Sequence, residues 1–432
     1  MCNNCELIAV RLVMIMTSRI THMKYKEVPR WTTSYLRWLV MVFVVLFISS
    51  SCDDSEDTPT PPANEKLVEA TLMYTASASQ LKFLAQFAGF DLDVDEIKYD
   101  ADVYKVTYKT TYKDAEIIAS GLVVLPKTSV EVGMVSFHHG TITDHDDAPS
   151  NTTETDPDAL LYAALSSSGF ITVIPDYLGF GSSSSILHPY YVEEYTATAV
   201  IDMLIAAKEL SVEENVNFNK KLFLAGYSEG GYVTMATHKG IEEQGLDDFE
   251  LIASFPAAGA YDIAGMENHL LTLDTYDDPS YIAYVIRAYE LTYDFPDVRS
   301  DFFQQPYADR IPGLFDGTKG TTEINSQLTT VLADLLQEEL YGNLNSNPEY
   351  SYIKDAFIEN SLTDWTPTAK MYMYHGDSDV TVPYQNSVDT YDKLIANGTS
   401  SSDLTFITLT GDHSSAIQPY IMDFVPKLWA LR

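Results

Sequence analysis

Cysteine and basic residues are both scarce in this chain. Its 432 residues include three cysteines, Cys2, Cys5 and Cys52, so the chain beyond residue 52 has no thiol. That part therefore lacks a disulfide framework, a cysteine nucleophile and a cysteine-ligated metal site. Lysine and arginine number 26 against 62 acidic residues, for a formal net charge of -36. This balance argues against binding to nucleic acid or anionic lipid through a basic patch.

A long membrane-spanning run is also missing near the N-terminus. The apolar residues 38–48 are too few to span a bilayer comfortably. Basic residues precede them and three serines follow, which is the pattern of a cleaved signal peptide. We therefore predict a signal peptide over residues 1–51, of which residues 1–22 look superfluous because Met23 would itself start a normal signal. The alternative is an ordinary signal peptide or an uncleaved anchor, without lipid.

The residues before Cys52 resemble the lipobox of bacterial lipoproteins, although Ser49 stands where an aliphatic residue is usual. This resemblance implies cleavage before Cys52, lipid on its sulfur, and export to the bacterial cell envelope, at the outer membrane. The acidic residues that follow resemble a surface-export signal of some Gram-negative lipoproteins, and the alternative is a solvated linker. Residues 52–66, acidic and then proline-rich, are predicted to form an extended tether.

From Leu67 onward, strand-like and helix-like segments alternate. Residues 103–108 and 117–125 are rich in β-branched side chains around a polar turn, which predicts a hairpin. Helical periodicity marks residues 159–168 and 193–210. Further buried strands are predicted at residues 132–137, 170–175, 221–225, 251–255, 370–374 and 404–409. This order predicts an α/β fold over residues 67–432, with a mostly parallel sheet and helices on both faces.

Residues 262–363 break the alternation. They are rich in Tyr, Leu and Asp and carry helical runs at 279–289 and 324–340, so we predict a helical cap over the C-terminal edge of the sheet. Aromatic side chains of this segment are candidates for an acyl or aryl pocket, or for the core of the cap itself. They are Tyr276, Tyr281, Tyr284, Tyr289, Tyr293, Phe295, Phe302 and Phe303.

The strongest local motif is Gly-Tyr-Ser-Glu-Gly at residues 226–230, between a predicted strand and an alanine-rich helical stretch. A strand that turns abruptly into a helix holds the central serine in a strained backbone, and flanking glycines avoid clashes. A hydroxyl presented there is suited to attack a carbonyl. Ser228 is thus the candidate nucleophile, in an elbow completed by Gly226, Tyr227 and Gly230.

A serine nucleophile requires a base, and the base requires an orienting group. Of the nine histidines, His413 alone follows the last predicted strand, in a loop that can reach the C-terminal edge of the sheet. Asp379 is the predicted acid because it follows strand 370–374 in a turn that Pro383 soon ends. Asp377 is its rival, and we expect that residue to cap the turn instead.

Segments 226–231, 375–383 and 411–413 carry Ser, Asp and His in the order of the α/β-hydrolases, which the chain resembles over roughly residues 67–431. It looks most like the secretory lipase and esterase branch, which also has a helical cap. The resemblance implies hydrolysis of carboxylic esters through an acyl-enzyme, with no metal or organic cofactor. In the resembling motif the acid lies three residues before a Val-Pro pair. Here the pair is Val382-Pro383, so the resemblance implies that the acid is Asp379.

An oxyanion hole needs two donors. The backbone N–H of Glu229, at the start of the predicted helix, is one candidate. The other is the N–H of Thr141 or Gly140, in a His-His-Gly-Thr loop that resembles the His-Gly oxyanion signature; alternatively, the histidine pair merely closes a strand. The side chain of Glu229 has no evident task. A loop at residues 176–182 resembles one that shapes the site in these hydrolases, and the acidic residues 144–147 read as a solvated loop rather than a metal site.

The sequence therefore predicts a serine hydrolase that acts on a small-molecule or lipid ester and is held at a membrane by lipid on Cys52. Two alternatives stay open. A serine peptidase of the same fold would need a carboxylate clamp for the substrate amine, for which Glu229, Glu193 and Glu194 are candidates. A non-catalytic surface binding protein would reuse the scaffold. The physiological ester, the membrane leaflet and the oligomeric state are not indicated.

Overall fold

The computed structural model describes residues 64–86, 92–295, 298–340, 344 and 347–432. The predicted signal peptide, Cys52 and most of the predicted tether lie outside these residues. Residues Asn64–Arg432 form one structural unit. In the parts described, no helix is both long enough and apolar enough to cross a membrane.

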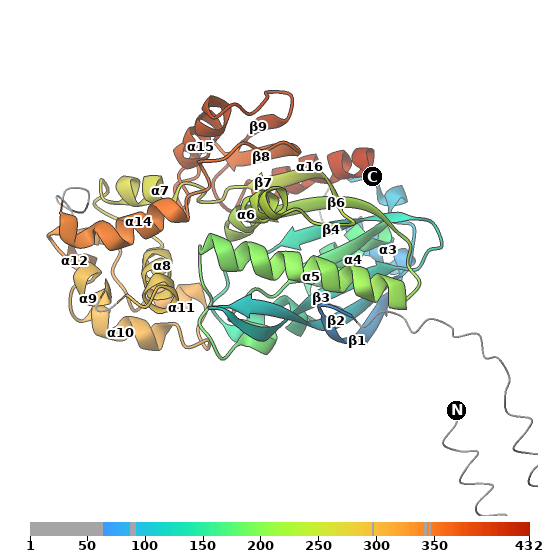
Figure 1. Ribbon diagram of the computed structural model, residues 1–432, viewed down its shortest axis with the longest axis horizontal. Coiled ribbons are helices and arrows are strands. Elements are labelled where there is room, and N and C mark those ends of the chain that lie inside the picture. The colour runs from blue at the N-terminus through green and yellow to red at the C-terminus, as the bar shows by residue number, and fades with distance from the viewer. Residues whose placement is uncertain (1–63, 87–91, 296–297, 341–343, 345–346) are drawn as a thin grey trace, which may run out of the picture. The chain divides into compact units, whose positions relative to one another are not determined.

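A nine-stranded sheet runs through the described unit in the order β1-β2-β3-β5-β4-β6-β7-β8-β9 (Figure 1). From β5 to β9 the neighbouring strands are parallel, whereas β1, β2, β3 and β5 pair antiparallel. The prediction of a mostly parallel sheet is confirmed. The strands are β1 (Leu67–Ala76), β2 (Ala101–Tyr112), β3 (Ala115–Pro126), β4 (Val132–His138), β5 (Phe170–Pro175), β6 (Phe218–Tyr227), β7 (Glu250–Ala257), β8 (Lys370–Gly376) and β9 (Leu404–Leu409).

The predicted hairpin is present as β2 and β3, which pair along their whole length up to Tyr112 and Ala115. Strand β1 was not predicted, because most of its side chains are exposed or half-buried and no buried periodicity marks it. The end of the predicted tether reaches the fold: Glu209 accepts the backbone N–H groups of Lys66 and Leu67 at 3.1 and 2.7 Å.

Helices cover both faces of the sheet, as predicted (Figure 1). Along β4, Val135 and Phe137 pack on the side of α4 and α16, whereas Val132 and Met134 pack on the side of α5. Side chains alternate across a strand, so a strand buried on both faces reads as a continuous apolar run. Outside residues 262–363, the α-helices in the part of the chain that the structure describes are α3 (Ala78–Ala85), α4 (Pro157–Ser167), α5 (Glu193–Glu213), α6 (Glu229–Gln244), α15 (Tyr384–Ala396) and α16 (Ile417–Leu431).

Between β7 and β8 the chain forms a group of mostly short helices, here called the cap helices, which lie at one end of the sheet (Figure 1). Their buried Leu, Ile, Tyr and Phe side chains join one hydrophobic cluster with residues of α6 and β8. They are α7 (Ile263–Leu270), α8 (Pro279–Thr292), α9 (Val298–Phe302), α10 (Tyr307–Leu314), α11 (Thr321–Asn325), α12 (Leu332–Leu335) and α14 (Ser351–Glu359).

The helical run at 279–289 is present as α8, but the single helix predicted at 324–340 is wrong. Helix α11 ends at Asn325, and Val331 then forms an isolated bridge with Thr275. The backbone N–H of Leu332 donates to Asp274 O at 3.0 Å, which binds this segment to a neighbouring loop. Buried leucines at helical spacing thus reach the core from short turns, because tertiary hydrogen bonds replace the helical ones.

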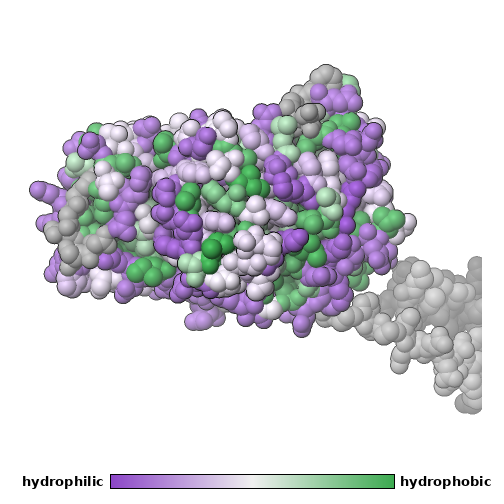
Figure 2. Space-filling view, turned by 90° about the horizontal axis from the view of Figure 1, so that it is seen from above, coloured by the Kyte–Doolittle hydropathy of each residue, from purple (hydrophilic) through white to green (hydrophobic). Residues whose placement is uncertain are grey.

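The surface agrees with the acidic composition. On the face shown in Figure 2, hydrophilic residues are spread widely and hydrophobic residues form only small groups between them.

Candidate active site

Ser228 occupies a strained turn between β6 and α6. Its backbone has φ 61° and ψ -126°, a conformation that costs a non-glycine residue free energy and is found at functional sites. The residues two positions before and after Ser228 have to be glycine: a Cβ on Gly226 would lie 2.3 Å from Gly230 O, and one on Gly230 would lie 2.0 Å from His138 O. The glycines of the predicted elbow thus allow β4, β6 and α6 to approach one another closely.

His413 and Asp379 meet Ser228 at the carboxyl edge of the sheet. The Ser228 hydroxyl lies 2.9 Å from His413 Nε2, and His413 Nδ1 lies 2.6 Å from Asp379 Oδ2. A carboxylate only accepts, so Nδ1 carries the imidazole proton and leaves Nε2 free to accept the serine proton. The residues come from loops after β6, β8 and β9, which end at the same edge because these strands are parallel.

Asp379 is buried and held by three hydrogen bonds. Besides the bond to His413, its carboxylate accepts hydrogen bonds from the backbone N–H of Val382 at 3.0 Å and from Nε2–H of His375 at 3.1 Å. Burial acts to raise the pKa of Asp379, but the hydrogen bonds from the two histidines outweigh it and lower this pKa. The carboxyl group is therefore ionised at neutral pH, as a partner for an imidazolium has to be.

His375 was not predicted to take part. Its Nδ1 lies 2.6 Å from the hydroxyl of Ser387, and its Nε2 also donates to Val382 O at 2.9 Å, so the ring fixes the turn that carries Asp379. The rival acid, Asp377, is exposed and accepts the backbone N–H of Gly411 at 3.2 Å. It therefore braces the loop of His413 from outside, whereas Asp379 contacts the imidazole.

The predicted oxyanion donors lie beside the nucleophile. Glu229 is the first residue of α6, where N–H groups have no intrahelical acceptor. A Cβ on Gly140 would lie 3.7 Å from Ser228 Cβ, so the backbone of the 138–141 loop passes close to the serine. Thr141 lines the same pocket as Ser228, and its hydroxyl is 2.8 Å from that of Tyr190.

The two histidines before Gly140, the buried His138 and the half-buried His139, support this loop. His138 lies between the hydroxyls of Ser136 and Thr234 at 2.9 and 2.8 Å, and burial lowers its pKa to about 3. His139 donates from Nδ1 to Gly140 O at 2.7 Å, and burial lowers its pKa as well. Both rings are therefore neutral at physiological pH. The loop at 176–182 contributes Tyr177, whose ring stacks on His139 at 4.1 Å.

The side chain of Glu229, for which the sequence suggested no task, is paired inside the protein. Its Oε1 lies 2.7 Å from Nε2 of His188, and the two side chains are only 3% and 4% exposed. His188 Nδ1 donates to Leu178 O at 2.7 Å. The rings of Tyr177, Phe180, Tyr190 and Tyr284 surround the imidazole at 5.4 to 5.9 Å. Only Pro189 marks His188 in the sequence, and no local signal links it to Glu229.

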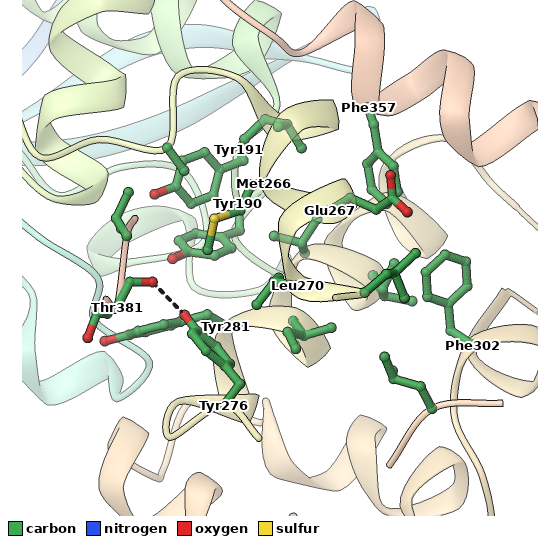
Figure 3. Close-up of a pocket in the computed structure, with 18 of the residues that line it drawn as sticks. Tyr190, Tyr191, Met266, Glu267, Leu270, Tyr276, Tyr281, Phe302, Phe357 and Thr381 are labelled. Carbon is green, nitrogen blue, oxygen red and sulfur yellow. Dashed lines mark hydrogen bonds between the residues drawn. The ribbon is translucent and has the colours of Figure 1, made fainter. Parts of the chain in front are cut away.

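A pocket of about 860 Å³, part of it open to solvent, extends from Ser228 between the cap helices (Figure 3). Of the eight cap aromatics named from the sequence, Tyr276, Tyr281 and Phe302 line it, and the others do not. Tyr284 instead stacks on Tyr190, and Tyr289 donates to Tyr191 O at 2.9 Å. The lining residues that the sequence did not indicate include Tyr190, Tyr191, Glu267, Leu270 and Phe357.

No cluster of three or more His, Cys, Asp or Glu side chains that could hold a metal ion occurs among the residues described. In the acidic loop 144–147, the carboxylate of Asp144 accepts the backbone N–H of Asp146 at 3.0 Å, so this loop caps its own turn.

Comparison with known proteins agrees with the geometry. A model of the secretory lipase family matches residues 145–261, which include the elbow. Among solved structures, a hydrolase candidate from Legionella pneumophila is 28% identical, covers 84% of this chain and 98% of its own, and has a TM-score of 0.75. No curated protein matches the chain.

Two further structures share the fold at lower identity. The rice cell wall degrading esterase LipA from Xanthomonas oryzae is 22% identical over 86% of this chain and 100% of its own, with a TM-score of 0.74. Candida antarctica lipase A in its closed state is 16% identical over 85% of this chain and 81% of its own, with a TM-score of 0.61. These likenesses show that the chain has the α/β-hydrolase fold, and the family match shows that residues 145–261 are similar to secretory lipases.

Proposed function

We propose that this chain hydrolyses carboxylic esters, with Ser228 as nucleophile, His413 as general base and acid, and Asp379 as the group that orients the imidazole. The observation that carries the proposal is the continuous line of hydrogen bonds from Asp379 Oδ2 through His413 to Ser228 Oγ, at 2.6 and 2.9 Å. The line ends in the wall of an apolar pocket, where an ester carbonyl can meet the serine.

In the proposed reaction the Ser228 oxygen attacks the ester carbonyl while its proton passes to His413 Nε2. The imidazolium then protonates the leaving alcohol oxygen, and an acyl-enzyme forms on Ser228. Water attacks this second ester by the same route, with His413 again as base, and releases the acid. Asp379 stays ionised throughout, because its hydrogen bonds hold its pKa low.

The oxyanion formed at each attack would accept hydrogen bonds from the backbone N–H of Glu229 and from that of Gly140 or Thr141. The position of Glu229 at the start of a helix supports this role, since the free N–H groups and the helix dipole favour negative charge there. The close approach of Gly140 to Ser228 supports the second donor.

Ester hydrolysis is favoured over peptide hydrolysis because the carboxylates available for an amine clamp are otherwise engaged or distant. Glu229 is paired with His188, and Glu193 with Lys239 at 2.5 Å. Neither these nor Glu194 lines the pocket. A clamp for an α-amine has to lie within a few bonds of the scissile carbonyl, and the cap carboxylate Glu267 lies at the other end of the pocket (Figure 3).

The test is a panel of p-nitrophenyl esters from acetate to palmitate, set against aminoacyl p-nitroanilides. Ser228→Ala is the control for hydrolysis that does not depend on the site. We expect ester turnover that Ser228→Ala abolishes, together with labelling of Ser228 by a fluorophosphonate probe. Faster turnover of the anilides would indicate a peptidase, and folded protein that the probe fails to label would indicate a binding protein.

We also propose that the cap helices, within residues 262–363, enclose the acyl chain. The match to a secretory lipase family supports export. From the sequence pattern we propose removal of residues 1–51, lipid on Cys52 and attachment to the outer membrane. Metabolic labelling with a radioactive fatty acid tests this: wild type should carry the label, and Cys52→Ala should not. An unlabelled wild-type protein in the membrane fraction would contradict the anchor.

A further inference from the structure

Glu267 is an unexpected residue in the wall of the pocket. It lies on cap helix α7, between residues Met266 and Leu270 of the same wall. Of the described residues that line the pocket, it is the only one with a carboxyl group, and most of the others are aliphatic or aromatic. A carboxyl group in such surroundings loses hydration, which is unfavourable unless something donates to it.

The carboxyl group of Glu267 lacks a full set of donors within the protein. Its Oε1 is buried and has no hydrogen-bond partner. Burial raises the pKa of Glu267 to about 7, and the positive charge of Lys354 offsets this only in part. A buried polar atom without a hydrogen-bond partner destabilises the folded protein. The protein therefore keeps a group that a bound molecule can satisfy.

The pocket has two chemically different ends (Figure 3). At one end, Tyr190 contacts Thr141, and Tyr276 donates to Thr381 O at 2.9 Å, so these polar groups already have partners beside the nucleophile. Glu267 lies at the other end with Phe302 and Phe357. A chain that starts at Ser228 and fills the pocket thus crosses apolar surface before it reaches Glu267.

The number of hydrogen bonds that Glu267 can make decides which chemical group of a ligand fits at this end of the pocket. An ammonium group has three N–H donors and would find one carboxyl acceptor there, so two donors would lose their hydration without replacement. A hydroxyl has one O–H to donate and can accept one proton in return, so a single carboxyl group matches it in either protonation state. A plain alkyl chain leaves Oε1 unsatisfied.

Building on the ester hydrolysis proposed above, we propose that the substrate is an ester whose apolar chain carries a hydroxyl group, and that Glu267 binds this hydroxyl at the end of the pocket remote from Ser228. The apolar wall would bind the chain, and Glu267 would discriminate hydroxylated from plain chains. A site that hydrogen-bonds a substrate hydroxyl rejects the analogue without it, because its own polar group is then left unpaired.

The test compares matched pairs of esters that differ only in a terminal hydroxyl. One arm uses p-nitrophenyl ω-hydroxyalkanoates against p-nitrophenyl alkanoates of equal length, which places the hydroxyl on the acyl side. The other arm uses acetate monoesters of α,ω-diols against alkyl acetates, which places it on the alcohol side. The readout is the ratio of kcat/KM within each pair, for wild type, Glu267→Leu and Glu267→Gln.

In wild type we expect a ratio above one at one range of chain lengths, in one of the two arms. Glu267→Leu should lower that ratio by roughly tenfold, the cost of one lost hydrogen bond to a buried partner. Glu267→Gln, whose amide still pairs with a hydroxyl, should keep part of the preference. The matched control is Glu323→Leu, which removes an exposed cap carboxylate outside the pocket and should leave the ratio as in wild type.

The outcomes separate this proposal from the one it rests on. If wild type hydrolyses plain esters in a Ser228-dependent manner but prefers no hydroxylated chain in either arm, this proposal is overturned and ester hydrolysis stands. A preference for hydroxylated chains that Glu267→Leu retains overturns it as well. If no ester of any kind is hydrolysed, both proposals fall.

Discussion

The buried pair between His188 and Glu229 offers a quantitative test of how the residue after the nucleophile is held. The proton on His188 Nδ1 is donated to Leu178 O. The hydrogen bond between His188 Nε2 and Glu229 Oε1 therefore uses a second proton, which the two side chains share. Both side chains are almost fully buried. We choose His188→Ala as the perturbation, because it leaves the carboxyl group of Glu229 in place without its partner.

The expected loss of stability follows from the distance between His188 Nε2 and Glu229 Oε1. Two unit charges 2.7 Å apart attract by about 6 kcal/mol at an effective dielectric constant of about 20, before the loss of hydration is set against this gain. Removal of one member of a buried pair typically costs about 3–5 kcal/mol, because the other is left uncompensated. We therefore expect His188→Ala to lower the free energy of unfolding by about 3–5 kcal/mol.

Glu229→Gln should behave differently. Its amide can donate to a neutral Nε2, so the pair keeps its hydrogen bond without a shared proton, and the loss should be about 1 kcal/mol. The pair of Lys208 and the exposed Asp248 serves as the matched control: Lys208→Ala breaks an ion pair of the same 2.7 Å length and should lower the free energy of unfolding far less than His188→Ala, because water screens the charges there.

Urea unfolding measures all three stabilities, and kcat on a short p-nitrophenyl ester measures the effect on the site. Since Glu229 begins α6 and its N–H is the proposed oxyanion donor, His188→Ala should lower kcat by up to about 100-fold in the protein that remains folded. A loss of stability below about 1 kcal/mol with unchanged kcat would refute the reasoning. So would a Glu229→Gln variant as unstable as His188→Ala.

Three further predictions concern the same site. Asp379→Asn should reduce kcat by about 10⁴-fold, because the amide no longer holds the reactive tautomer of the imidazole, whereas Asp377→Asn should reduce it less than tenfold; equal effects in steady-state assays would contradict the assignment. Since the pKa of Glu267 is raised from 4.5 to about 7, the unfolded chain loses this proton first, and stability falls as pH rises from about 4.5 to 7. Glu267→Gln should therefore gain stability relative to wild type over that range, by about 3 kcal/mol at pH 8 in urea unfolding, and a pH-independent difference would count against the raised pKa. Gly230→Ala would place a Cβ 2.0 Å from the backbone of His138, so it should abolish activity and lower the melting temperature, and a near-native variant in thermal unfolding would contradict the close approach.

Much of the fold could be predicted because its determinants are local. The spacing of apolar residues and the positions of the glycines predict a strand and a helix around Ser228, and the structure has β6 and α6 there. His413 and Asp379 could be nominated because parallel strands end at one edge, so residues just after β8 and β9 have to lie near the elbow. Their contact is observed, and their catalytic roles stay predictions.

The errors arose where long-range contacts decide. The helix predicted at 324–340 had suitable spacing, yet hydrogen bonds to the segment around Asp274 and Thr275 break it into turns. The side chains of strand β1 show no regular pattern of burial. The strand forms because its backbone pairs with the edge of β2. Neither the broken helix nor strand β1 can be predicted from a dozen consecutive residues of the sequence.

By itself, the sequence determined the alternation of strands and helices, the strained elbow and the order of Ser, Asp and His, since these depend on period, on backbone sterics and on chain direction. Only the tertiary structure decided that His188 partners Glu229, that His375 holds Asp379, and that Glu267 lines the pocket with its Oε1 lacking a hydrogen-bond partner. Hydrogen bonding and loss of hydration act between atoms that folding brings together. Their partners are therefore a property of the packed chain, and no spacing along the sequence encodes them.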